Sequence, residues 1–361
     1  MISAPARQRA LELRAWFETQ GAAVVEPPIL QDARLLLDLY GEDIRARAYV
    51  TSDAVRGEQM LRPDFTVPVV QMHMAGGANP ARYTYAGEVF RRQDAHLDRD
   101  SEYLQVGFEI MGGADPAAAD AEVFALMSDI ARPLDLRAVT GDIGLLLAAV
   151  NGLRTSEARR AALRRHIWRP RRFRMLLDRF SGRRPVPETR AALLANPEPM
   201  LGAQPLVGLR SRAEIEARIT ALHADAATGA LSRIEVELLE ALLDVQETLP
   251  NALEHLRDIA IDLPSITQAI EGLMRRVEAL AARGLDVDAL EFEARYGRNS
   301  MEYYDGFVFG FSAKHRSDLP AVISGGRYDA LTARLGDGTL LPAVGAVVRP
   351  GVLTELEGSG V

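Results

Sequence analysis

The sequence contains no cysteine, which excludes disulfide bonds and metal sites built on thiolate ligands. Histidine is also scarce. The 361 residues include six histidines, and no two of them have the spacing of paired metal ligands. We therefore expect a protein that holds neither a metal ion nor another cofactor.

Long apolar stretches are missing as well. The chain has no run of about eighteen apolar residues, and its N-terminus lacks the charged and then apolar pattern of a secretory signal. Hydrophobic residues make up 48% of the sequence and charged residues 25%, as in soluble globular proteins. We expect a cytoplasmic protein that does not contact membranes, with one large domain or two of ordinary size.

Lysine is nearly absent, since Lys314 is the only one, and the formal net charge is −8. A negative chain is poorly suited to nucleic-acid binding, which depends on cationic side chains that neutralise phosphates. Residues 154–184 are an exception, because they hold twelve arginines against the two acids Glu157 and Asp178. This segment could bind RNA, but we favour the solvated face of helices or a surface that contacts another protein.

Hydrophobic periodicity predicts a chain of mixed α and β elements with one long helical stretch. Helices are predicted at 7–20, 67–74 and 120–130, and strands at 22–25, 85–91, 103–111 and 138–143. From residue 145 the pattern becomes helical, and residues 285–293 return to the sheet. We predict a core formed by residues 1–144 and 285–361, with a helical insertion at 145–284.

Two short segments near the C-terminus have the composition of a polar pocket. Glu302 to Phe309 is predicted as a turn followed by a strand, and it carries the adjacent Tyr303 and Tyr304. Gly325 to Asp329 places two glycines, which allow close backbone approach, before Tyr328. On spacing alone, a plain hairpin with tyrosines in its core explains these segments equally well.

Polar residues at two earlier positions also suggest a binding site. Asp64 and Thr66 precede the helix predicted at 67–74, where they can cap it, and a carboxylate there can also bind an ammonium group. On the strand predicted at 103–111, Gln105 and Glu109 share one face. If Glu109 is buried, it needs a polar partner.

In combination, these segments resemble the histidyl-tRNA synthetase family. Residues 302–309 and 325–329 are similar to its two histidine-specific signatures, and residues 7–28, 83–112 and 341–351 resemble motifs 1, 2 and 3 of class II synthetases. The resemblance implies an α+β fold: a class II synthetase-like core with an antiparallel six-stranded type of sheet flanked by helices, and a helical insertion. It also implies a histidine-binding site made of Asp64, Thr66, Arg91, Gln105, Glu109, Tyr303, Tyr304 and Tyr328.

The same resemblance implies a role for each part of this site. Residues equivalent to Asp64 and Thr66 hold the α-amino group of the amino acid in that family. An arginine equivalent to Arg91 binds the α-phosphate of the aminoacyl-adenylate, and Glu109 is expected to face the imidazole ring.

Several positions depart from the synthetase pattern. Asn299 stands where the family has an arginine that helps activate the carboxylate, and the loss of one such contact typically slows a reaction by on the order of a hundredfold. Gln93 replaces a glutamate of motif 2. The sequence ends directly after motif 3, where the family continues into an anticodon-binding domain.

Motif 3 itself also departs from the pattern. Val352 stands at the position of the arginine that binds the γ-phosphate of ATP. Arg349 is close by, but we expect Pro350 and Gly351 to break the helix that would present it. These departures predict a site that binds histidine without activating it.

A histidine site without activation resembles the regulatory subunits of ATP phosphoribosyltransferase, which belong to the first step of histidine biosynthesis. The resemblance implies a non-catalytic homodimer within a hetero-oligomer, with L-histidine and the short-form catalytic subunit as partners and without tRNA. Two alternatives remain. The chain could be a free-standing synthetase-like enzyme that activates histidine with ATP, because Arg91 is retained, or an RNA-binding module that uses residues 154–184.

Overall fold

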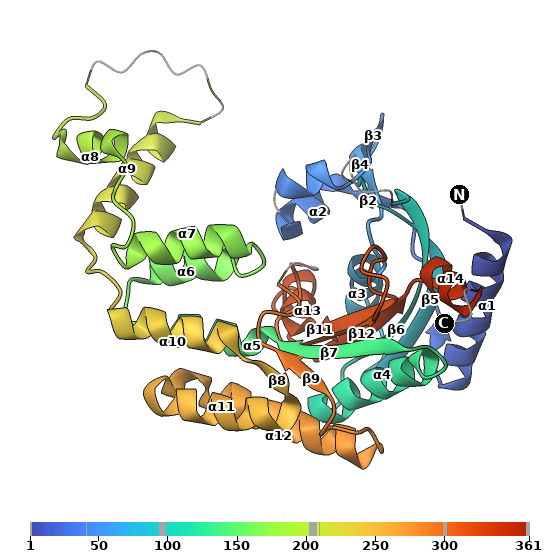
Figure 1. Cartoon of the computed structure of the whole chain (residues 1–361). Coiled ribbons are helices and arrows are strands. Elements are labelled where there is room, and N and C mark those ends of the chain that lie inside the picture. The colour runs from blue at the N-terminus through green and yellow to red at the C-terminus, as the bar shows by residue number, and fades with distance from the viewer. Residues whose placement is uncertain are drawn as a thin grey trace.

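A nine-stranded sheet forms the centre of the protein (Figure 1). The computed structural model describes residues 2–40, 42–93, 99–201, 208, 210–298 and 302–358. Six adjacent strands run antiparallel to their neighbours in the order β5-β6-β12-β11-β10-β7. Their bounds are Ala81–Phe90, Glu102–Met111, Ala343–Val348, Ile323–Arg327, Phe307–Ala313 and Leu136–Asp142. This arrangement confirms the predicted α+β fold with an antiparallel six-stranded core.

Short strands extend both edges of the six-stranded core. Strand β1 (Ala23–Val24) pairs in parallel with β5 at one edge. At the other edge, β9 (Glu291–Glu293) pairs in parallel with β7, and β8 (Gln246–Thr248) pairs antiparallel with β9. A separate three-stranded sheet has the order β2-β4-β3, with bounds Leu30–Asp32, Gly57–Leu61 and Val50–Asp53.

Helices cover one face of the large sheet because alternate residues of its strands are apolar on that side. In β10, the rings of Phe307, Phe309 and Phe311 lie 6.1, 5.1 and 5.3 Å from the ring of Phe124 in α4. In β6, the ring of Phe108 lies 5.2 Å from a phenylalanine of α1. The helices at this face are α1 (Ala4–Thr19), α4 (Pro116–Ala131) and α14 (Pro350–Gly358).

The opposite face of the sheet carries shorter elements. They are α2 (Ala33–Tyr40), the 3-10 turn η1 (Glu42–Ala46), α3 (Thr66–Met74) and α13 (Asp329–Leu335). Because side chains alternate along β6, Gln105 and Glu109 point to this second face, away from Phe108. The candidate site therefore lies on the side of the sheet that α4 does not cover.

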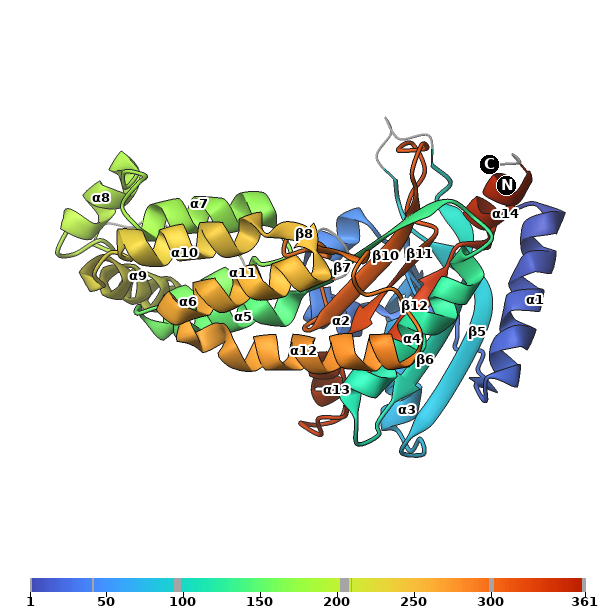
Figure 2. The same cartoon turned by 60° about the horizontal axis from the view of Figure 1, so that its bottom comes forward.

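Helices between β7 and β9 form an extension that projects from the sheet, with α8 and α9 far from it in both views (Figures 1 and 2). The elements are α5 (Ile143–Gly152), α6 (Glu157–Arg165), α7 (Pro170–Phe180), α8 (Glu188–Ala195), α9 (Arg212–Ala227), α10 (Arg233–Asp244), α11 (Leu249–Asp262), η2 (Pro264–Ile266) and α12 (Thr267–Ala282). Strand β8 also lies within residues 145–284, and the sequence did not predict it. The boundaries of the insertion stay a prediction.

Arginines of segment 154–184 connect the helices of this extension. Arg159 is buried, and its Nε donates to Asp225 at 2.7 Å, which ties α6 to α9. Arg174 and Arg183 donate to Glu240 of α10 at 3.0 and 2.8 Å. These contacts favour a structural use of the segment, because each of these guanidinium groups is paired with a carboxylate of a neighbouring helix.

A buried ion network fastens α12 to the core. The Nε of Arg276 donates to Asp120 of α4 at 2.8 Å, and its Nη1 donates to Asp142 at the end of β7, also at 2.8 Å. Arg327 of β11 donates to the other oxygen of Asp120 at 2.6 Å. All four side chains are buried. Among the helices in the described ranges, none is long and apolar enough to cross a membrane.

Candidate functional site

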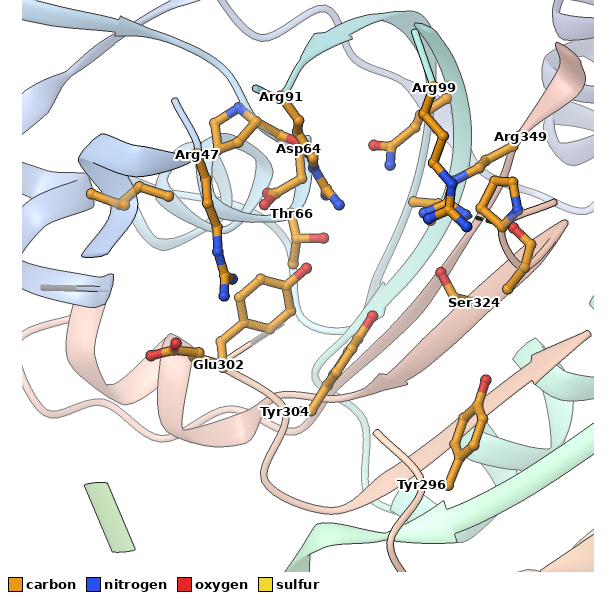
Figure 3. A pocket seen from close by; sticks show the side chains of 17 residues that line it. Arg47, Asp64, Thr66, Arg91, Arg99, Tyr296, Glu302, Tyr304, Ser324 and Arg349 are labelled. Carbon is orange, nitrogen blue, oxygen red and sulfur yellow. Dashed lines mark hydrogen bonds between the residues drawn. The ribbon is translucent and has the colours of Figure 1, made fainter. Parts of the chain in front are cut away.

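A cavity of about 370 Å³ opens on the face of the sheet opposite to α4 (Figure 3). Its floor includes side chains of three adjacent strands, namely Gln105 of β6, Val347 of β12 and Ser324 of β11. The residues that line the cavity are Ile44, Arg47, Pro63, Asp64, Thr66, Arg91, Arg99, Gln105, Tyr296, Glu302, Tyr303, Tyr304, Pro320, Ala321, Ser324, Val347 and Arg349. Six of the eight predicted site residues are thus brought together here.

Asp64 and Thr66 lie at the start of α3, where the chain turns from β4 into the helix. The Oδ1 of Asp64 accepts a hydrogen bond from the backbone N of Val67 at 3.4 Å, so the carboxylate caps the helix as the sequence predicts. Both side chains also line the cavity, although each is almost fully buried. Helix capping and ligand binding are therefore compatible at this position.

Gln105 brings a buried hydrogen-bond acceptor to the cavity. The side chain is 1% exposed, and its Oε1 is buried without a hydrogen-bond partner among the residues that the structure describes. Leaving a buried polar atom unsatisfied costs about 1–3 kcal/mol. Because Gln105 lines the same cavity as Asp64 and Thr66, a ligand that donates a hydrogen bond to its Oε1 would remove this cost.

Glu109 lies behind the cavity and does not line it. Its carboxylate accepts hydrogen bonds from the hydroxyl groups of Tyr328, Tyr85 and Thr66 at 2.5, 2.7 and 3.3 Å. Gly345 of the neighbouring strand β12 lies opposite Glu109, and a Cβ at Gly345 would stand 1.4 Å from Oε2 of Glu109. Only a glycine leaves room for the carboxylate at this position.

Burial dominates the electrostatics of Glu109. It raises the pKa of Glu109 to about 7, although the hydrogen bonds from Tyr328, Tyr85 and Thr66 act to lower the pKa. Burial and the neighbouring Glu109 also raise the pKa values of Tyr85 and Tyr328 well above the usual range. Tyr328, like Glu109, is not part of the cavity lining, whereas Thr66 both lines the cavity and donates to Glu109.

Tyr303 and Tyr304 form an aromatic wall of the cavity. Their rings lie 4.9 Å apart at 67°, and the ring of Tyr303 lies 5.9 Å from that of Tyr328. Gly326 makes space for Tyr304, because a Cβ at Gly326 would lie 2.8 Å from the tyrosine ring. The second glycine of segment 325–329 is therefore needed for the close approach of the two predicted signatures.

Four arginines line the cavity: Arg47, Arg91, Arg99 and Arg349. The Nε of Arg91 donates to the carbonyl of Pro63 at 2.7 Å, and Nη1 of Arg349 donates to the carbonyl of Ala321, also at 2.7 Å. Burial lowers the pKa of Arg349, and the positive charges of Arg91 and Arg99 lower it further. Figure 3 shows Arg99 and Arg349 on the other side of the cavity from Asp64 and Thr66.

The expected helix break after Arg349 is wrong. Helix α14 begins at Pro350 and continues through Gly351 to Gly358. Proline suits the first position of a helix, because its fixed φ is helical and its missing N–H would have no partner there. Arg349 directly precedes this helix and lines the cavity, whereas Val352 is a partly buried residue packed on the core.

The cavity is therefore richer in cations than the departures from the synthetase pattern predict. Arg47, Arg99 and Glu302 were not among the predicted site residues. Asn299, the first of the departures, lies outside the described residues. Within the described ranges, no cluster of three or more His, Cys, Asp or Glu residues is suited to bind a metal ion.

Comparison with known proteins places the chain among histidyl-tRNA synthetase-like sequences. The family model described as histidyl-tRNA synthetase matches residues 3–198 and 211–351. An ATP phosphoribosyltransferase regulatory subunit of Brucella anthropi is 33% identical over 357 residues, which covers 92% of this chain and 93% of that protein. The protein of the same name from Brucella canis is 32% identical over 358 residues, with the same two coverages.

Solved structures of similar proteins share the fold. An ATP phosphoribosyltransferase regulatory subunit/histidyl-tRNA synthetase from Bacillus halodurans C has a TM-score of 0.68 at 21% identity and covers 97% of this chain and 78% of its own. A histidine–tRNA ligase subunit from Alicyclobacillus acidocaldarius has a TM-score of 0.62 at 23% identity and covers 99% of this chain and 93% of its own.

Proposed function

Because the chain belongs to the histidyl-tRNA synthetase family, and within it to the regulatory subunits of ATP phosphoribosyltransferase, we propose that its cavity binds L-histidine. Binding of L-histidine, the end product of the pathway, would then regulate the catalytic subunit, which is a separate chain. Occupancy can control that subunit only if histidine binds two states of the complex with different affinity, typically by about 1–3 kcal/mol.

The observation that carries this proposal is the buried Oε1 of Gln105, which has no hydrogen-bond partner within the described ranges and belongs to a residue of the same cavity lining as Asp64. An α-ammonium group has three N–H donors, and the cavity offers it the carboxylate of Asp64, the Oε1 of Gln105 and the hydroxyl oxygen of Thr66. Because Thr66 donates its only hydroxyl hydrogen to Glu109, it can only accept a hydrogen bond from a ligand.

The carboxylate of an amino acid would be bound by the cationic part of the cavity. Arg91 directly follows β5, and its Nε–H donates to the carbonyl of Pro63, which fixes the guanidinium group. A planar guanidinium group can donate two parallel hydrogen bonds to a carboxylate. One cavity thus offers acceptors for the ammonium group and donors for the carboxylate of a zwitterion.

The imidazole ring would lie against Tyr303 and Tyr304. Glu109 acts on it indirectly in this proposal, because the carboxylate is engaged with the hydroxyl groups of Tyr85, Tyr328 and Thr66. Direct contact between Glu109 and the imidazole would require these hydrogen bonds to be exchanged. The role of Glu109 as the acceptor for the imidazole, expected from the family, thus stays a prediction.

We further propose that the protein works in the cytoplasm, as a homodimer within a hetero-oligomer with the short-form catalytic subunit, and that it has no catalytic activity of its own. The names of the Brucella relatives support the regulatory role. A histidine-activating enzyme is the second candidate. The four arginines of the cavity favour it, because cations of this kind bind the phosphates of ATP in activating enzymes.

Isothermal titration calorimetry with L-histidine tests the proposed site. We expect the wild-type chain to bind histidine and Asp64→Asn to bind it at least about tenfold more weakly, since a hydrogen bond to a charged group contributes roughly 1.5–3 kcal/mol. Asp262→Asn, at the exposed end of α11, is the matched control and should bind as the wild type does. Absence of binding to the wild type, or equal affinity of both variants, would contradict the proposal.

A further inference from the structure

A second cavity shares a wall with the candidate histidine site. It has a volume of about 520 Å³ and lies where the turn between α6 and α7 faces α2, α13 and the segment before β10. Glu302 and Tyr303 line both cavities, whereas Trp168 and Arg169 of the α6–α7 turn line only the second. A ligand that moves Glu302 or Tyr303 in the first cavity therefore changes the surroundings of Trp168.

An ion pair connects the α6–α7 turn to this shared wall. Nη2 of Arg169 lies 3.2 Å from Oε2 of Glu302, and its Nε donates to Oε1 at 3.3 Å. The two residues are 133 positions apart in sequence, and their side chains are only 20% and 15% exposed. Because the pair is partly shielded from water, its charges interact more strongly than those of an exposed surface pair.

A second contact attaches Arg298, which lies four positions before Glu302 in the sequence, to the same turn. Arg298 is 4% exposed, and its Nε donates to the carbonyl of Ile167 at 2.9 Å. Its guanidinium group lies 4.9 Å from the centre of the Phe173 ring in α7. Arg298 and Glu302 are thus both attached to the α6–α7 region.

The charge of Glu302 makes the ion pair relevant to the ligand. Among the described residues that line the first cavity, Glu302 and Asp64 are the acidic ones. Arg169 neutralises Glu302 from outside this cavity and holds its carboxylate toward α7. Without Arg169, Glu302 would be left as a partly buried, unbalanced carboxylate that is free to turn toward the ammonium group or the arginines of the site.

We propose that Arg169 is a positioning residue of the histidine site, which sets Glu302 and Tyr303 and transmits occupancy of the site to the α6–α7 turn. The inference rests on the proposed function, because it takes histidine as the ligand of the first cavity. Histidine would bind more tightly to one arrangement of Glu302 and Tyr303, and the Arg169–Glu302 pair would couple that arrangement to the environment of Trp168.

The two tryptophans of the chain allow a direct optical test. Trp16 lies in α1, so Trp16→Phe leaves Trp168 as the only tryptophan, next to the shared wall. In this background we expect saturating L-histidine to shift the fluorescence emission of Trp168. Arg169→Gln should lose the shift, and Arg169→Lys should restore part of it, since lysine keeps the charge without the planar guanidinium group.

Controls separate this inference from the proposed function. Arg172→Gln, at an exposed position in the first turn of α7, should keep the full emission shift. Calorimetry on each variant measures histidine binding separately, and emission is compared at saturation, so a change in affinity alone cannot mimic the loss. If Arg169→Gln does not fold, as judged by circular dichroism, Glu302→Gln breaks the same pair from the other side.

The outcomes are distinct. Failure of histidine to bind the Trp16→Phe protein would overturn the proposed function itself. Binding without any shift of Trp168 emission, or a shift that persists unchanged in Arg169→Gln and Glu302→Gln, would overturn the positioning role and leave the histidine site standing. Loss of the shift in these variants, with partial recovery in Arg169→Lys, is the result that the structure predicts.

Discussion

Glu109 is held in a ring of hydroxyl groups, and this arrangement explains how a carboxylate is tolerated inside the sheet. Tyr85, Tyr328 and Thr66 donate to it, and Gly345 on the facing strand leaves space for it. Each hydroxyl that donates to Glu109 keeps only lone pairs for its other neighbours. Because Thr66 donates its hydrogen to Glu109, its hydroxyl oxygen can only accept a hydrogen bond, as an ammonium ligand requires.

The raised pKa of Glu109 predicts a pH-dependent stability. The folded pKa of about 7 lies above the ordinary 4.5, so the folded state holds the proton more tightly than the unfolded state does. This contribution to the free energy of unfolding is fully present below pH 4.5 and is lost as the pH rises through 7. At about 1.36 kcal/mol per pKa unit, the loss is on the order of 3 kcal/mol.

Glu109→Gln should remove this dependence, because the amide does not titrate. Urea unfolding of both proteins between about pH 4.5 and 8 should show the wild type losing stability relative to the variant as the pH rises. Asp305, whose pKa burial also raises to about 7, is present in both proteins, so its contribution cancels in the comparison. Two parallel stability curves would contradict the buried, hydroxyl-bound state of Glu109.

The residues of the site differ in how far the sequence could predict them. Asp64, Thr66 and Gln105 lie in recognisable segments, and the structure places all three at the cavity. The alternation of side chains along β6 correctly predicted that Glu109 and Gln105 point to the same face of the sheet. It could not show that Glu109 lies behind the cavity lining and does not line the cavity itself. Arg47 lies outside the recognised motifs, and Arg99 lies in the loop of the motif 2 segment, where no strand or helix periodicity indicates which side chains face the site.

At the scale of elements, Arg276 gives α12 a buried ionic attachment to the core. Arg276 bridges Asp120 of α4 and Asp142 at the end of β7, and all three side chains are buried. Breaking a buried ion pair by removing one partner costs about 3–5 kcal/mol, because the remaining charge is left unbalanced. Arg327 still pairs with Asp120, so the unbalanced charge would be mainly that of Asp142.

We therefore expect Arg276→Ala to lower the free energy of unfolding by about 3–5 kcal/mol. Arg275→Ala, at the adjacent exposed position of the same helix, should change it by less than about 0.5 kcal/mol. Chemical denaturation of the two variants and the wild type measures both values. Equal stability of the two variants would show that the network does not hold α12 to the core.

Prediction of elements from the sequence succeeded where local signals agree with the tertiary structure. The expected helix at 7–20 corresponds to α1, and the strand pair at 85–91 and 103–111 corresponds to β5 and β6. Strand β8 was missed because three residues carry no periodicity, and its pairing with β9 depends on a distant part of the chain. Pro350 was misread because proline ends a helix from inside it but suits its first position.

At the scale of the whole molecule, a histidyl-tRNA synthetase-like fold belongs to a regulatory subunit of ATP phosphoribosyltransferase. The core keeps the antiparallel sheet and an amino-acid-sized polar cavity, and the extension from α5 to α12 contacts the signature segment through Arg169 and Arg298. A regulatory subunit needs such a contact, because a signal from the ligand must reach a surface that another chain can sense.

The arginines in the cavity make one functional test necessary at this scale. If the chain has no activity of its own, ATP–pyrophosphate exchange in the presence of histidine should stay at the background of a reaction without protein. A histidyl-tRNA synthetase assayed in parallel provides the positive control. Exchange well above background would favour the histidine-activating enzyme and contradict the non-catalytic role.

Reconstitution with a short-form catalytic subunit of ATP phosphoribosyltransferase tests the central claim most directly. The rate of the reconstituted enzyme is measured with and without saturating L-histidine, for complexes that contain the wild-type chain or Asp64→Asn. We predict that histidine changes the rate of the wild-type complex and that Asp64→Asn assembles equally well but loses this response at the same histidine concentration. An identical histidine response in both complexes, or none in the wild type, would contradict the account.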